Sequence, residues 1–65
     1  MNYARKQNKL FQKMGDQAMR VMFAVNAKDP SLAILRKRHA AAIRLADLAT
    51  ELEDSIAEQV REREK

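Results

Sequence analysis

The chain has no cysteine, which excludes a disulfide framework, a thiolate metal site and a thiol nucleophile. It has no tryptophan, and its three rings, Tyr3, Phe11 and Phe23, are too few to interleave with nucleic-acid bases. The one histidine, His39, has no carboxylate three or four residues away, which argues against a metal site or an acid–base pair. We therefore expect no cofactor, no metal, no small-molecule ligand and no catalytic residue, and predict that the protein is not an enzyme.

Long hydrophobic runs are also missing. The longest uncharged run, Val21–Ala27, is far shorter than the roughly 20 residues of a membrane-spanning helix. Residues Met1–Lys6 have no apolar stretch behind them and so do not resemble a signal peptide. By default we expect a soluble, cytoplasmic protein, and 65 residues predict one small domain, residues 1–65.

Helix-forming residues dominate what remains, and no alternating strand pattern occurs. Pro30 is the only proline. The segment Asp29-Pro30-Ser31 predicts a helix start, with Asp29 as N-cap and Pro30 at the first helical position. Asn26 and Lys28 suit the end of a preceding helix. The sequence thus predicts a helix over about residues 3–28, a turn over about 28–31 and a second helix over about 30–62. So short a connection favours antiparallel neighbours.

Each predicted helix carries an apolar stripe with alternating spacings of three and four residues, as helix packing requires. In the first helix the stripe comprises Tyr3, Ala4, Leu10, Phe11, Met14, Ala18, Val21, Met22 and Val25. In the second it comprises Ile34, Leu35, Ala41, Ala42, Leu45, Leu48, Ala49, Leu52, Ile56 and Val60. These stripes are wider than one hairpin can cover. We predict an all-α antiparallel helical hairpin that pairs into a homodimeric four-helix bundle or packs on a helical partner protein.

Charge is distributed unevenly. Residues 1–28 carry six basic residues against one acid, whereas residues 45–65 carry seven acids against three basic residues. In a hairpin the basic start lies beside the acidic end, which leaves the cations near the turn without acidic partners. The basic residues Lys6, Lys13, Arg20, Arg36, Lys37 and Arg38 are candidates for a phosphate-binding surface; the alternative is a solvated face that keeps the protein soluble. Arg38 falls inside the second stripe, and Gln7 and Gln59 are similarly placed. A polar residue at such a position fixes the register of two packed helices or extends outward to solvent, and for Arg38 we expect the outward course.

Four apolar residues fall outside the stripes near the turn, namely Met19, Phe23, Leu32 and Ile43. They are candidates for a partner-binding patch or a dimer interface, and scattered exposed apolar residues are the alternative reading.

Two resemblances concern architecture. The hairpin plan and length resemble the plasmid-encoded Rop-type RNA-binding dimers, although no run of residues matches. The segment Asp29-Pro30-Ser31-Leu32-Ala33 resembles the turn of type III secretion needle subunits, which are helical hairpins too, but the charged carboxyl end departs from the apolar end of those subunits.

The leading hypothesis is a small basic regulatory or adaptor protein that acts by helix-mediated protein–protein interaction. The alternative is a dimeric nucleic-acid-binding hairpin that recognises RNA or duplex through its phosphates and shape. A basic amphipathic role at a membrane surface is the third hypothesis.

Overall fold

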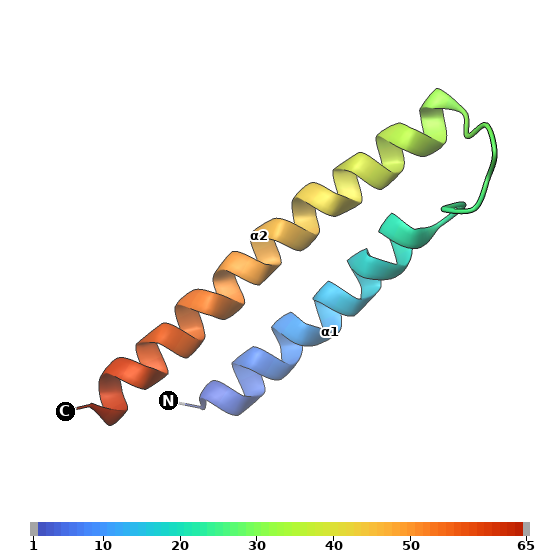
Figure 1. Cartoon of the computed structure of the whole chain (residues 1–65). Helices are drawn as coiled ribbons and strands as arrows, with labels where there is room; N and C mark the ends of the chain where they lie inside the picture. Colours follow the sequence, from blue (N-terminus) through green and yellow to red (C-terminus); the bar gives the residue numbers. More distant parts are fainter. Residues whose placement is uncertain (1, 65) are drawn as a thin grey trace.

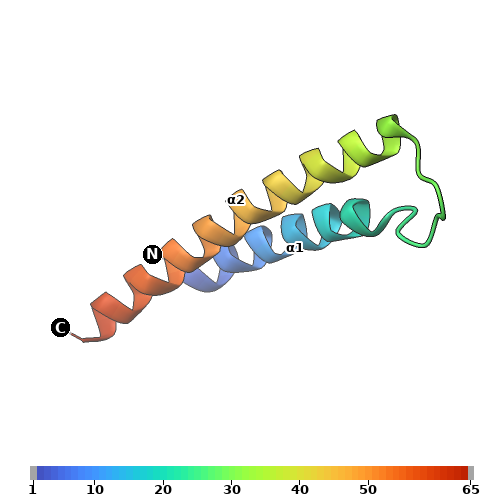
Figure 2. The ribbon, with the colours of Figure 1, turned by 45° about the horizontal axis from the view of Figure 1, so that its top comes forward.

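The computed structural model describes residues 2–64 and contains two helices, α1 (Tyr3–Met22) and α2 (Leu32–Arg63). They pack side by side as an antiparallel hairpin, with both chain ends at one end and the connection at the other (Figures 1 and 2). The molecule is a rod of 53 × 15 × 15 Å. This confirms the all-α hairpin, and no strand occurs within residues 2–64.

The first helix ends six residues earlier than the sequence predicted. Phe23 leaves the helical conformation with ψ 128°, and Ala24 has a positive φ of 56°. The carbonyl oxygen of Val21, which Val25 would bond in a continuing helix, instead accepts from Arg38 Nε at 2.8 Å. The Val25 amide donates to the Met22 carbonyl at 3.1 Å. At the end of α1, a long-range side chain therefore takes the place of the Val25 amide at the Val21 carbonyl.

The second helix begins at Leu32, and its N-cap is Ser31 rather than the predicted Asp29. Ser31 has extended φ and ψ, and its side chain accepts a hydrogen bond from the Ile34 amide at 3.2 Å. Pro30 lies outside the helix, so the connection spans residues 23–31 and is longer than expected. At the other helix, Asn2 caps in the same way by accepting from the Arg5 amide at 3.0 Å.

The seam between the helices follows a regular three–four spacing. On α1 it comprises Tyr3, Gln7, Leu10, Met14, Gln17 and Val21; on α2 it comprises Ile34, Arg38, Ala41, Leu45, Leu48, Leu52, Ser55 and Gln59, all buried or half-buried. Among the described residues, only Leu10 and Ala41 are buried apolar side chains, at 6% and 4% exposed. The hairpin alone therefore has a very small core.

Polar contacts fix the register of the seam. Gln7 Nε2 donates to Ser55 Oγ at 3.3 Å and to Gln59 Oε1 at 3.0 Å, near the chain ends. The bond from Arg38 to Val21 aligns the helices near the connection. These contacts place Gly15, midway along α1, at about the level of Ala46 on α2.

Candidate interaction surfaces

The two helices present different chemistry on the two sides of their seam. Because the helices are antiparallel, residues that directly precede seam positions lie on one side of both helices, as Arg20 precedes Val21 and Lys37 precedes Arg38. Residues that directly follow seam positions lie on the other side, as Phe11 follows Leu10 and Ala42 follows Ala41. The first side is charged and the second is apolar.

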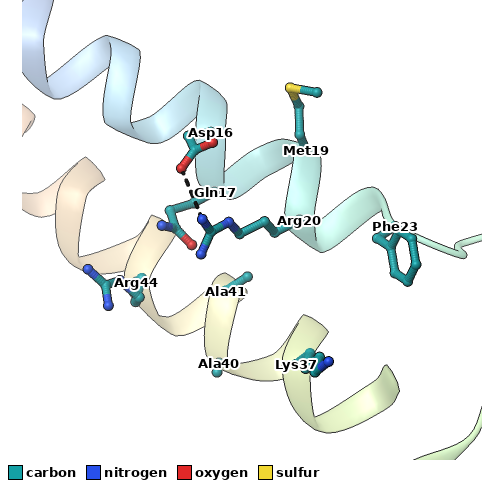
Figure 3. Close-up of a pocket in the computed structure, with 9 residues that line it drawn as sticks. All are labelled: Asp16, Gln17, Met19, Arg20, Phe23, Lys37, Ala40, Ala41 and Arg44. Carbon is teal, nitrogen blue, oxygen red and sulfur yellow. Dashed lines mark ion pairs between the residues drawn. The ribbon is translucent and has the colours of Figure 1, made fainter. Parts of the chain in front are cut away.

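The charged side holds a groove of about 680 Å³, which we call the basic groove. It is lined by Asp16, Gln17, Met19, Arg20 and Phe23 of α1 and its end, and by Lys37, Ala40, Ala41 and Arg44 of α2. Three cations thus meet at one groove, and Asp16 is the only acid in its lining. Asp16 forms an ion pair with Arg20 at 3.6 Å, so it compensates one of the three (Figure 3).

Figure 3 shows how these side chains lie. Arg20 runs along the groove toward Asp16 and Gln17, whereas Met19 is directed away from α2. Gln17 is 7% exposed, and its Oε1 has no hydrogen-bond partner. The neighbouring hollow is lined by Lys13, Asp47 and Glu51 among others, so the basic start of the chain does lie beside its acidic end.

The basic candidate residues separate in the structure. Arg20 and Lys37 line the basic groove, and Lys6 and Lys13 precede Arg20 at seven-residue intervals on the same face of α1. Arg36 is exposed outside the groove lining, whereas Arg38 turns into the seam. The expected outward course of Arg38 is therefore wrong, because the carbonyl oxygen at the end of α1 offers its guanidinium a hydrogen bond.

The four off-stripe apolar residues do not form one patch. Met19 and Phe23 line the basic groove and are 76% and 63% exposed. Leu32 and Ile43 are exposed too, but neither lines the groove. Leu32 instead continues the apolar side at the start of α2.

Sequence reasoning did not select Arg44 and Gln17 for a site; the seven-residue interval from Lys37 to Arg44 was the available signal.

The apolar side is a second row with three–four spacing, and we call it the apolar flank. It comprises Ala4, Phe11, Gly15, Ala18 and Met22 on α1 and Leu32, Leu35, Ala42, Ala46, Ala49, Ile56 and Val60 on α2. All of these are exposed except Ala18, which is half-buried. Three polar residues, Asn8, His39 and Glu53, fall within the same row.

Half of each predicted stripe is thus used inside the hairpin and half is not. Phe11 was assigned to the same stripe as Leu10, yet it is 67% exposed. Leu35 and Ile56 are likewise exposed, although their neighbours Ile34 and Ser55 lie in the seam. The width of the stripes therefore reflects two adjacent rows, of which the second faces solvent.

Near the chain ends, burial and two carboxylates act on Tyr3. Loss of solvent around the hydroxyl is the largest effect, and the carboxylates of Glu58 and Glu62 add to it. Together they raise the pKa of Tyr3 above its ordinary value of 10.0.

Comparison with family models, with curated proteins and with solved structures gave no match for this chain. Neither helix is long and apolar enough to cross a membrane, within the residues that the structure describes. Residues 2–64 also hold no group of three or more side chains suited to a metal ion.

Proposed function

We propose that this protein is a small non-enzymatic regulatory or adaptor protein that acts by helix-mediated protein–protein contact. The exposed apolar flank carries this proposal. It runs along both helices, and it has the three–four spacing that another helix requires for packing. A long and mainly apolar surface of this kind is uncommon on monomeric proteins and marks interaction sites.

Energetics support the same surface. Phe11, Leu35 and Ile56 expose large apolar side chains, and burial contributes about 25 cal/mol for each Å² of apolar surface removed from water. Of the four residues that the sequence suggests as a partner patch, Leu32 belongs to this flank. The partner surface that we propose is accordingly the flank rather than the set Met19, Phe23, Leu32 and Ile43.

Two phenylalanines of similar exposure allow a matched test. A photoreactive phenylalanine analogue replaces Phe11 on the flank or Phe23 on the groove side, in cells that express the chain at its native level. After irradiation we expect discrete protein adducts from position 11 and not from position 23. Absence of any protein adduct at position 11 would contradict the proposal.

Nucleic-acid binding is the second candidate function, and the basic groove favours it. Arg20, Lys37 and Arg44 come from two helices to one groove, and cations so arranged bind phosphates through counterion release. Phe23 is the only ring in the lining, so the expected ligand is a duplex or structured RNA recognised by phosphate and shape rather than by stacked bases.

Two charge-reversal variants distinguish groove binding from general attraction to a basic protein. Lys37→Glu with Arg44→Glu changes the groove, whereas Arg5→Glu with Arg36→Glu makes the same change in net charge outside its lining. For groove binding, the first variant abolishes the affinity for a structured RNA, the second retains most of it, and affinity falls steeply with salt. Equal losses in both variants would contradict a groove site.

A further inference from the structure

We propose that the apolar flank binds a second copy of this chain, in antiparallel orientation, so that two hairpins form a four-helix bundle related by a two-fold axis. This inference rests on the proposed role of the flank as an interaction surface and names its occupant. Five observations support it: the exposed surface of the hairpin, the area of the flank, the residues at its centre, its symmetry and the distribution of charge along the hairpin.

The single hairpin exposes more surface than its mass predicts. Its accessible surface is 5503 Å² for 7.5 kDa, whereas a compact monomer of that mass exposes roughly 4,200 Å². Residues 2–64 hold two buried apolar side chains and no group of side chains suited to a metal ion, and the sequence has no cysteine for a disulfide, so the usual means of stabilising so small a fold are missing from this part of the chain. Association is the means that remains.

The flank is large enough for a specific interface. The twenty residues of α1 span about 30 Å, and two helices side by side present a strip about 20 Å wide. A second hairpin would therefore cover about 600 Å² on each copy, or about 1,200 Å² in total, which is the lower bound for stable specific interfaces.

Small residues occupy the centre of the flank. Gly15 and Ala46 lie at about the same level, and Ala18, Ala42 and Ala49 surround them. A Cβ at Gly15 would meet nothing within 4 Å, so packing inside the hairpin does not require this glycine. Glycine in a helix interior costs about 1 kcal/mol relative to alanine. Close approach of another backbone at this point accounts for a residue that the hairpin alone does not need.

The flank of α2 is nearly symmetric about Ala46. His39 and Glu53 stand seven residues before and after it, and Leu32 and Val60 stand fourteen residues before and after it. A two-fold axis that crosses α2 at Ala46 places the flank of α2 against the same flank of the second copy. Each residue then faces its pair partner from the other chain. Apolar residues then face apolar residues at the two ends, and His39 faces the Glu53 carboxylate of the second copy.

The overall charge favours the same orientation. Residues 15–45 carry six Lys and Arg against two Asp, whereas the other residues carry seven basic residues and seven acids. Parallel hairpins would place the two positive halves together. Antiparallel hairpins place each positive half beside the half that holds the acids, which lowers the repulsion between the copies.

A chain without cysteine allows a direct test of this axis. In the full chain, Ala46→Cys puts one thiol where the axis crosses α2, and Ala40→Cys puts one on the groove side of the same helix. Under mild oxidation we expect rapid disulfide-linked dimers from Ala46→Cys and few from Ala40→Cys, together with a two-chain mass for the parent by sedimentation equilibrium. A parallel pair keeps the two Ala46 positions apart, so a two-chain mass without this disulfide would overturn the orientation.

Gly15→Ala gives a second test, because it stabilises a lone hairpin but weakens the proposed dimer. In a lone hairpin the added methyl group meets open space and increases helicity and thermal stability. In the proposed dimer it enters a close contact and weakens self-association about tenfold. A variant that is more stable and associates as the parent does would contradict packing at the centre of the flank.

The two proposals fail in different ways. If the purified chain is a monomer at all concentrations, and position 11 nevertheless forms adducts with a different protein in cells, the second copy is wrong and the interaction function stands. If position 11 forms no protein adduct at all, the interaction function itself is wrong.

Discussion

The guanidinium of Arg38 on α2 donates from Nε to the carbonyl oxygen of Val21 on α1 at 2.8 Å, at the point where α1 ends. This contact satisfies a carbonyl that a helix end leaves without an intrahelical partner. It also ties the connection of residues 23–31 to the register of the two helices.

Replacing this arginine tests its contribution. Arg38→Met keeps most of the aliphatic packing and removes the donor, and we expect a loss of about 1–2 kcal/mol in the free energy of unfolding. Urea denaturation at one fixed protein concentration measures it, because association also shifts apparent stability. Arg36→Met, which removes an exposed cation two residues away, is the control and changes stability little. Equal effects of the two variants would contradict a structural role for Arg38.

A polar layer near the chain ends gives the second prediction. Gln7 donates to both Ser55 and Gln59, and Ser55 is 2% exposed. Gln7→Leu leaves these two acceptors without their donor and lowers stability by about 1–2 kcal/mol. The triple variant Gln7→Leu, Ser55→Ala, Gln59→Leu removes the whole layer and restores or exceeds the parent stability.

Urea denaturation of the single and triple variants measures this difference. If the polar layer fixes the register, its removal allows the two helices to slide along each other, since apolar side chains do not specify one alignment. We then expect less dispersed amide signals in the NMR spectrum of the triple variant. If Gln7→Leu alone is as stable as the triple variant, leaving Ser55 and Gln59 without their donor has no cost and the prediction is wrong.

The third prediction concerns pH. Tyr3 is the only tyrosine and the chain has no tryptophan, so absorbance at 295 nm reports this residue alone. Because burial and the carboxylates of Glu58 and Glu62 raise the pKa of Tyr3, we expect a titration midpoint above 10.0 in the folded protein and a return to that value in urea. Glu58→Gln with Glu62→Gln lowers the midpoint, whereas Glu51→Gln leaves it in place.

The sign of the linked stability follows from the same shift. The folded state holds the phenolic proton more tightly than the unfolded state does. The contribution to stability is therefore fully present below pH 10 and is lost as pH rises through the folded pKa. Stability that increases across this range would contradict the assignment.

Residue spacing predicted the hairpin well and its local details less well. The three–four stripes indicated packed helices, and the short connection and the charge pattern indicated that they are antiparallel. The stripes and the charge pattern are reliable because they depend on many residues at once. At the end of α1, the Val21 carbonyl accepts a long-range bond from Arg38, which neither Asn26 nor Lys28 reveals. Likewise, Asp29 and Ser31 are both good N-caps by composition, and the fold selects Ser31.

For the candidate surfaces, too, the sequence predicted the general pattern but not the local arrangement. Periodicity found the apolar residues, but it merged two adjacent rows, since Leu10 and Phe11 point only about 100° apart on a helix. The packed structure separates them into one buried and one exposed position. The run Arg36-Lys37-Arg38 shows this too: three consecutive cations point in three directions, and only Lys37 lines the groove.

The unequal lengths of the helices have a consequence for local opening. α2 extends past the last turn of α1 toward the connection, since Arg38 already lies beside Val21 (Figures 1 and 2). Amides in the second turn of α2 become free to exchange with deuterium when one helix frays, whereas those near Leu45 exchange only after two helices separate. The time course of deuterium uptake along α2 thus measures how far the neighbouring helix extends along it.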